Sequence, residues 1–355
     1  MFIKNLKLKY NSFMELDNKE KAKVVKEALI NNSLMIFTMI AIIYIQIQRP
    51  QFLSRESIIN IVSLSAAAMP LALGVAGAII LTGTDLSAGR IVGLTACISA
   101  SLLQMFDYSN KMFPDLVQIP IIVVLIIVIA VGAFFGFING FCVAKFSLHP
   151  FIVTLATQLM VYGVILMYLM NGNNNGQSIS GLSPEFTNLI KGSLFKIGGT
   201  PIPNYVLMAI ALTGIMWVVW NKTSFGKNMF AVGSNPEAAN VSGVNVGFTI
   251  MMVFTLAGAL YAFSGFIEAA RIGSNSANTG LNYELDAIAA CVIGGISFVG
   301  GIGKIRGVVM GVVLLKLIFV GLSFLSVSVN MIYIIKGLII LVACAIDMRK
   351  YLVRK

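Results

Sequence analysis

The chain has 355 residues, of which 58% are hydrophobic and only 11% are charged. Soluble domains carry about 25% charged residues, so this composition excludes an ordinary soluble protein. The formal net charge of +11 is concentrated in lysines and arginines at the two ends of the chain. Basic ends around apolar spans follow the positive-inside rule of membrane proteins, so we expect no nucleic-acid partner.

Long charge-free stretches predict the fold class. Several of them exceed the roughly 20 residues that cross a hydrocarbon core as a helix, and unbroken apolar runs exclude the alternating strands of a membrane barrel. We therefore expect an all-α protein, a polytopic transmembrane helix bundle of about ten spans. The expected spans are residues 31–48, 57–82, 87–106, 117–144, 151–170, 203–221, 246–267, 285–301, 305–325 and 328–347.

An even number of spans places both termini on one side of the membrane, and the basic ends place that side in the cytoplasm. The expected organisation is a basic cytoplasmic segment over residues 1–30, a transmembrane domain over 31–347 and a basic cytoplasmic tail over 348–355. Within the transmembrane domain, residues 221–245 form the longest polar cytoplasmic loop.

The first irregular feature is the break TGTDLSAGR at residues 82–90, between the second and third spans. Asp85 or Ser87 could cap the third helix at a cytoplasmic turn, and Arg90 could pair with Asp85. Alternatively, a broken helix enters the bundle here, since irregular backbone at depth is tolerated where it faces protein or a cavity. The sequence leaves both possibilities open.

Glycines recur at helix-packing spacing in two spans. The stripes are Gly132, Gly136 and Gly140 in the fourth span, and Gly303, Gly307 and Gly311 at the start of the ninth. Small residues four apart let helix backbones approach closely in lipid. They predict a tightly packed bundle.

The stretch NPEAANVSG, inside the polar loop 221–245, has the signals of a short helix. Asn235 suits the N-cap and Pro236 the first helical position. Glu237 complements the positive end of the helix dipole, and Gly243 suits the left-handed residue after the helix. So short a helix is unstable alone, so we expect the bundle or a partner to hold it.

Two polar segments are expected outside. Residues 171–203 contain SPEFTNLIKG, which predicts a short helix with Ser183 as N-cap and Pro184 at the first position. Residues 271–286 place Glu284 and Asp286 near the start of the eighth span.

Lys316 and Lys336 fall inside the last two expected spans, both roughly 15 Å from the cytoplasmic edge at 1.5 Å per residue. An intramembrane charge costs several kcal/mol unless it is paired or hydrated. The sequence names no partner for either lysine. Snorkelling, contacts in a dimer interface and a place on a solute path all remain open.

Catalytic chemistry is not indicated. The only histidine is His149, and the four cysteines stand singly in apolar runs without metal-ligand spacing, so we expect neither a catalytic nor a metal site. The segment GGIGKIRG lacks the spacing and the Ser or Thr of an ATP-binding P-loop. All 14 Asp and Glu residues fall in tails, turns or span ends, which disfavours an ion-coupled secondary transporter.

Four segments carry a resemblance to a known family. They are FGKNMFAVGSNPEAANVSGVNV, TGTDLSAGRIVGL, LHPFIVTLAT and YELDAIAACVIGGISFVGGIGKIRGVVMGVVL. In this order they resemble the ABC importer permeases for sugars of the ribose and galactose type, over roughly residues 35–350. The TDLSAGR and AACVIGGISF stretches are most similar to the galactose and methyl-galactoside branch.

The resemblance implies a permease without an ATPase or cofactor of its own, in the cytoplasmic membrane of a bacterium. Its expected partners are a second copy of the permease, a cytosolic ABC ATPase that binds ATP, an extracytoplasmic sugar-binding protein and the sugar. Ribose, another sugar or a nucleoside is the alternative substrate, and an ion-coupled transporter is the more distant alternative function.

The resemblance also assigns candidate site residues. A coupling helix would contact the ATPase through Gly233, Asn235, Pro236, Glu237, Ala238, Ala239 and Gly243. Polar residues of the translocation path would include Asp85, Asn139, Thr154 and Thr157. Glu284 and Asp286 would dock the binding protein, unless the outer segments are plain connecting loops.

Overall fold

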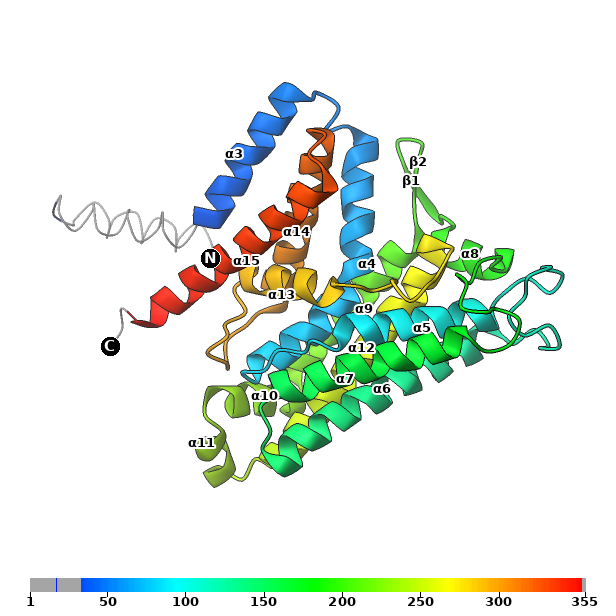
Figure 1. The fold of residues 1–355 in the computed structure, drawn as a ribbon. Helices are drawn as coiled ribbons and strands as arrows, with labels where there is room; N and C mark the ends of the chain where they lie inside the picture. Colours follow the sequence, from blue (N-terminus) through cyan, green and yellow to red (C-terminus); the bar gives the residue numbers. More distant parts are fainter. Residues whose placement is uncertain (1–16, 18–32, 353–355) are drawn as a thin grey trace.

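The computed structural model describes residue 17 and residues 33–352, and over these residues the protein is a bundle of helices (Figure 1). Within this described part of the chain, six helices are long and apolar enough to cross a membrane: α4 (Arg55–Ile80), α6 (Ile121–Phe146), α7 (Pro150–Leu169), α9 (Asn204–Lys222), α12 (Val246–Ile272) and α14 (Ile305–Phe324). These helices confirm an α-helical membrane protein. The expected segment 1–30 lies outside the described residues, except Asp17.

The remaining apolar helices are α3 (Ser33–Gln48), α5 (Ala88–Leu102), α13 (Tyr283–Ile293) and α15 (Val329–Leu352). Each of the ten expected spans thus coincides with a helix, but over the described residues α3, α5 and α13 have only 16, 15 and 11 residues, fewer than the roughly 20 that cross a membrane. The expected span 285–301 is wrong, because α13 has only 11 residues and the chain from Gly294 to Lys304 is irregular. The expected span 87–106 is also shortened, to the 15 residues of α5.

Polar segments lie at the two ends of the bundle. At one end are α10 (Ser224–Ser234) and α11 (Pro236–Val241), and the last described turns of α15 point the same way (Figure 1). At the other end are α8 (Pro184–Lys191) and the antiparallel hairpin of β1 (Phe195–Ile197) and β2 (Thr200–Ile202). The expected helix at SPEFTNLIKG is confirmed as α8, whose N-cap Ser183 accepts a hydrogen bond from the Phe186 N–H.

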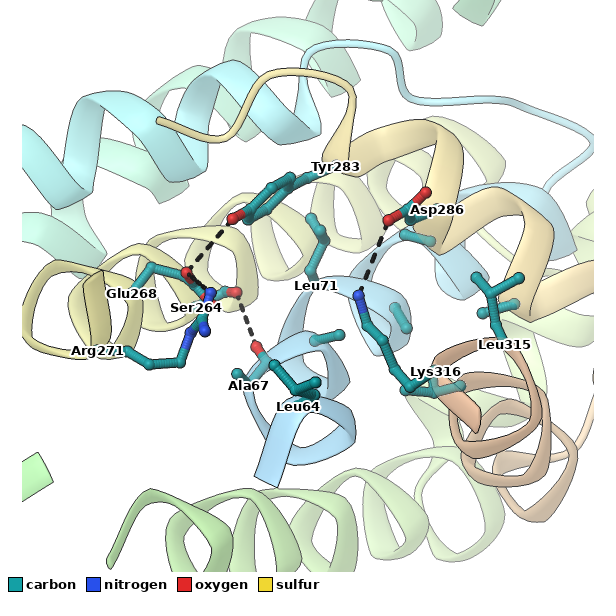
Figure 2. Close-up of a pocket in the computed structure, with 15 residues that line it drawn as sticks. Leu64, Ala67, Leu71, Ser264, Glu268, Arg271, Tyr283, Asp286, Leu315 and Lys316 are labelled. Carbon is teal, nitrogen blue, oxygen red and sulfur yellow. Dashed lines mark hydrogen bonds and ion pairs between the residues drawn. The ribbon is translucent and has the colours of Figure 1, made fainter. Parts of the chain in front are cut away.

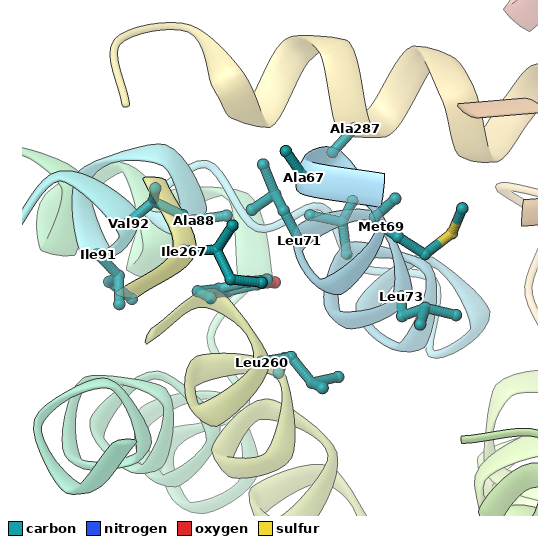
Figure 3. Packing of buried hydrophobic residues seen from close by; sticks show 14 of the residues in the cluster. Ala67, Met69, Leu71, Leu73, Ala88, Ile91, Val92, Leu260, Ile267 and Ala287 are labelled. Carbon is teal, nitrogen blue, oxygen red and sulfur yellow. The ribbon is translucent and has the colours of Figure 1, made fainter. Parts of the chain in front are cut away.

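The long helix α12 is the centre of the packing. It contacts α6 most extensively, then α5 and α4. Figure 3 shows the core at this crossing, where Leu71 of α4 lies near Ile267 of α12 and Ala88 of α5. Since all of these side chains are fully or almost fully buried, this part of the bundle is an apolar core.

The first glycine stripe packs against α12, as its spacing predicts. A methyl group at Gly132 would meet the Gly258 carbonyl oxygen, and one at Gly136 would meet the Phe254 carbonyl oxygen. The second stripe brings Gly307 and Gly311 of α14 against Gly294 and Ala290 at the end of α13. Backbone therefore packs directly on backbone at both crossings.

We predict that Gly136→Ala destabilises the permease, because the added methyl group has no room against α12. Gly163→Ala in α7 is the matched control, since a methyl group there meets nothing within 4 Å. In the control, higher helix propensity should stabilise the fold by up to about 1 kcal/mol. Thermal unfolding of the two purified variants measures the difference, and equal melting temperatures would contradict the close contact.

Two breaks in the helices meet inside the bundle. The segment 81–87 joins α4 to α5, and the segment 273–282 joins α12 to α13. Gly89 in the first turn of α5 packs against Gly280, and Gly93 packs against Thr279. Because α4 and α12 end on opposite sides of the bundle, both breaks run inward, and the short helices α5 and α13 begin in the interior. The structure therefore places residues 83–90 within the bundle rather than at a surface turn, and leaves Thr82 exposed at the start of the break.

Candidate functional site

The short helix α11 has the caps that the sequence predicts. The Asn235 side chain accepts a hydrogen bond from the Ala238 N–H at 2.9 Å, and Pro236 occupies the first turn. At the other end Gly243 is left-handed, with φ of 84°. The Gly243 N–H donates to the Asn240 carbonyl and the Val244 N–H to the Ala239 carbonyl, each at 3.0 Å. This is the Schellman pattern of a closed helix end.

The bundle holds α11 on one face only. Ala239 is 4% exposed, whereas Val241 is 90% exposed. Glu237 and Ala238 are exposed as well, so the outer face of α11 presents a carboxylate beside apolar side chains. Such a face, on a helix too short to stand alone, is suited to contact with another protein.

Gly233 has a different position from the rest of the expected contact. It lies in α10, a helix that the sequence did not predict, and packs against the Ile80 carbonyl and Gly301. The Gly301 N–H also donates to the Ile80 carbonyl at 2.9 Å. Gly233 is therefore buried and joins α10 and α11 to the end of α4 and to the irregular segment after α13.

An open groove of about 850 Å³ runs beside α11. One wall is α11 itself, with Pro236, Glu237 and Asn240. The other is formed by the adjoining ends of α6 and α7 and the start of α12, with Val143, Pro150 and Val246 among its lining residues. The end of the bundle that carries α11 thus has a recess between the exposed helix and the apolar spans.

The expected path residues come together around the first break. Asp85 accepts hydrogen bonds from the Ser87 N–H at 3.0 Å and the Ser87 hydroxyl at 2.6 Å. The Asn139 amide donates to the Ser87 oxygen at 2.9 Å, and the Thr157 hydroxyl donates to the Asn139 oxygen at 2.6 Å. These bonds join the break to α6 and α7.

Thr154 completes this polar cluster. Its hydroxyl accepts from the Leu86 N–H and donates to the Thr84 carbonyl, both at 3.1 Å. All four expected path residues are at most 1% exposed, and Asp85 and Thr154 satisfy the Leu86 and Ser87 N–H groups and the Thr84 carbonyl of the break. In this conformation they hold the break in place, and their role in a translocation path stays a prediction.

Glu284 and Asp286 lie within the helix bundle rather than on its outer surface. Glu284 is 3% exposed, and its carboxylate lies against Gly89 at the N-terminus of α5. A carboxylate there is stabilised by the positive end of the helix dipole. This burial disfavours the expected docking of a binding protein by Glu284 in this conformation, and docking by the pair stays a prediction.

Asp286 is the partner of both intramembrane lysines. Its carboxylate lies 2.9 Å from Lys336 Nζ in α15 and 3.8 Å from Lys316 Nζ in α14. This pairing was not predicted from the sequence, because Asp286 was expected at the membrane edge, at the start of a full span. The break before α13 carries it deeper, to the level of the lysines.

A cavity of about 80 Å³ lies between α4, α12, α13 and α14 (Figure 2). We call it the charged cavity, because four charged side chains are part of its lining. Glu268 and Arg271 of α12 form a two-bond ion pair at 2.7 and 2.8 Å on one side. The Tyr283 hydroxyl donates to Glu268 at 3.5 Å, and the Asp286 and Lys316 pair lies on the other side. Glu268 and Tyr283 were not predicted as site residues, because only the fold brings the end of α12 against the start of α13.

Comparison with known proteins identifies the family. Residues 57–344 match the family described as branched-chain amino acid transport system, permease component. The galactose/methyl galactoside import permease protein of Escherichia coli K12 is 47% identical over 87% of this chain and 91% of its own length. The protein of the same name in Haemophilus influenzae is 44% identical over 93% of this chain and 97% of its own length.

A more distant relative is the ribose import permease protein of Escherichia coli K12. It is 31% identical over 92% of this chain and 96% of its own length. No solved structure matches the chain. The matched region contains α11, both breaks and the charged cavity, so the chain belongs to this family of transport-system permease components.

Proposed function

We propose that the chain is the membrane-spanning permease subunit of an ATP-driven importer for galactose or methyl galactosides. The observation that carries the proposal is the identity of 44% and 47% to two import permeases of that name, along nearly their whole length. The lower identity of 31% to a ribose import permease makes ribose the second candidate. The location is the cytoplasmic membrane, crossed several times.

The proposed assembly contains two copies of this chain, a cytosolic ABC ATPase and an extracytoplasmic sugar-binding protein. ATP is bound by the ATPase, and this chain has no cofactor of its own. The end that carries α11 then faces the cytoplasm, together with both termini, and a topology of about ten spans includes the two broken ones. The end that carries α8 faces the binding protein.

The packing of α11 supports a mechanical role. A push on its exposed face is passed through α10 and Gly233 to the end of α4 and to the segment 294–304. The end of α4 is joined to α5 by the break 81–87, and the segment 294–304 follows the end of α13, so both short helices are connected to these contacts. Movement of the ATPase is thus passed to the interior through these packed contacts, which supports alternating access.

Uptake into vesicles tests the function. Proteoliposomes that contain the permease and the ATPase should accumulate galactose only with ATP inside the compartment that holds the ATPase and with loaded binding protein on the other side. An ionophore that collapses proton and sodium gradients should leave uptake unchanged. Uptake that follows an ion gradient without nucleotide would overturn the proposal, and the preference of the binding protein among galactose, ribose and nucleosides would identify the substrate.

The N-cap of α11 gives a second prediction. Asn235→Ala removes the acceptor for the Ala238 N–H and should destabilise this helix by about 1 kcal/mol. We expect uptake to fall about threefold to tenfold, since that energy corresponds to a several-fold shift in the population of the folded helix. Ser183→Ala removes the equivalent cap of α8 and is the matched control, which should not alter ATPase binding. Equal ATP-driven uptake by the two variants would contradict the role of α11.

A further inference from the structure

We infer that the charged cavity is a sugar-binding subsite within the permease itself. This inference rests on the proposed function, because it assigns the place where a sugar released by the binding protein is held during transfer. The cavity is distinct from the polar cluster around Asp85, which contributes no residue to its lining.

The polar lining offers the groups that a polyhydroxylated molecule needs. Each sugar hydroxyl both donates and accepts a hydrogen bond. Glu268 and Asp286 provide acceptors, and Arg271 and Lys316 provide donors, around one cavity. Bonds to charged partners are the stronger ones, and charged pairs on two sides can bind hydroxyls at both edges of a ring.

Lys316 and Asp286 are not hydrogen-bonded to each other, so both groups are available to a hydroxyl that lies beside them in the cavity. Their closest atoms are 3.8 Å apart, which is longer than a hydrogen bond, whereas Asp286 and Lys336 are 2.9 Å apart. Lys336 therefore holds the carboxylate in place, and Lys316, which lines the cavity, remains able to bind a ligand.

The wall of the cavity that α4 provides is apolar and consists mainly of small side chains. Leu64, Leu71 and the alanines at 67, 68 and 72 line it, with the Tyr283 ring at one edge (Figure 2). The small alanines are the reason that a cavity exists between four packed helices. An apolar wall with a few converging polar groups is the usual composition of a small-molecule site, and it suits the C–H face of a sugar ring.

The location of the cavity fits delivery from outside. Glu268 and Arg271 lie in the last turns of α12, at the end opposite α11. The side chains of Arg271, Lys316 and Asp286 are 25%, 22% and 19% exposed in this single chain. Partly exposed charges inside a membrane face water or protein rather than lipid, so the mouth opens onto an aqueous path or the second copy.

The break before α13 links the cavity to the transport cycle. Tyr283 and Asp286 lie in the first turn of α13, directly after the irregular segment 273–282. Substrate sites at such breaks recur in transporters, because an interrupted helix brings polar groups and backbone into the interior. The far end of α13 leads to the segment that contacts Gly233, so a movement of α11 can change the shape of the cavity.

The test fills the cavity without removing a charge. Ala68→Leu places three additional carbon atoms in the cavity from a half-buried position, and Ala259→Leu makes the same change at a half-buried position of α12 outside the lining. In the reconstituted importer, Ala68→Leu should lower galactose uptake by about tenfold, equivalent to about 1.4 kcal/mol. ATP hydrolysis stimulated by loaded binding protein should remain within about twofold of the unsubstituted protein, as should both activities of Ala259→Leu.

Tyr283→Phe is the second variant, because it keeps the ring and removes only a hydroxyl whose bond to Glu268 is long, at 3.5 Å. It should also lower uptake without lowering stimulated hydrolysis. Unchanged uptake in both variants would overturn the subsite, and a parallel loss of uptake and hydrolysis would do so as well, because it would show a structural or coupling role.

A direct measurement separates the subsite from the proposed function. Equilibrium dialysis of radiolabelled galactose against the permease and ATPase complex, without binding protein, should show saturable binding that Ala68→Leu abolishes and Ala259→Leu retains. The absence of saturable binding would overturn the subsite. If the unsubstituted importer showed no ATP-driven uptake of any sugar, the proposed function would fail, and dialysis would still decide whether the cavity binds sugar.

Discussion

Replacement of Glu237 by lysine is expected to uncouple the permease from its ATPase while leaving the bundle in the membrane. Glu237 is exposed in the first turn of α11, where its carboxylate complements the helix dipole. Reversal of that charge costs the helix about 0.3–1 kcal/mol and places a cation in the proposed ATPase contact. We expect ATP-driven uptake to fall by about tenfold or more. A tenfold change corresponds to a loss of about 1.4 kcal/mol in the free energy of contact with the ATPase.

The matched control for this change is Glu185→Lys. Glu185 follows Ser183 and Pro184 in the first turn of α8, as Glu237 follows Asn235 and Pro236 in α11, but it lies at the other end of the bundle. Co-purification of the ATPase with each variant is the measurement. Undiminished recovery with the Glu237 variant, or an equal loss with both variants, would count against the coupling role of α11.

Asp286→Asn is expected to destabilise the permease strongly. The substitution removes the negative charge that lies between Lys316 and Lys336, so two like charges remain within the bundle without compensation. Removal of one partner of a buried ion pair typically costs about 3–5 kcal/mol. A lower melting temperature and a lower yield of folded protein should follow, whereas Asp107→Asn, at an exposed loop position, should change neither.

A compensating substitution separates charge from packing. Lys336→Met added to Asp286→Asn removes the lysine at the shorter distance and keeps an apolar chain of similar length. Replacement of a buried pair by apolar residues is often neutral or stabilising, so the double variant should recover much of the lost melting temperature. If the double variant were less stable than Asp286→Asn alone, the cost would not arise from unpaired charge.

The local signals in the sequence predicted local structure well. The caps of α11 and α8 were predicted at the correct residues, because each cap is a contact between groups at most a few residues apart. The first glycine stripe was correctly predicted to be a packing face, because helical periodicity alone places its members on one side. The α10 helix was missed, since its residues are polar enough to be interpreted as a loop.

The breaks explain most of what the sequence analysis did not predict. An apolar segment such as 285–301 has the composition of a span whether it is helical throughout or ends at Ile293. Left-handed glycines at 295, 300 and 301 allow the irregular backbone. Only the packing of Gly294 against α14, and of Gly300 and Gly301 against α4 and α10, shows where it goes. With the break misplaced, Asp286 was assigned to the membrane edge and the two lysines had no partner.

The amino-acid sequence alone determined that this is a helical membrane protein, approximately where its helices lie, and that a short capped helix projects from it. These properties depend on hydropathy, periodicity and capping, which act over fewer than about 30 residues. The tertiary structure decided which polar groups meet inside the bundle. Asp286 and Lys336 are 50 positions apart, and Gly89 and Glu284 are still farther apart, so only the packing of whole helices could bring their side chains together.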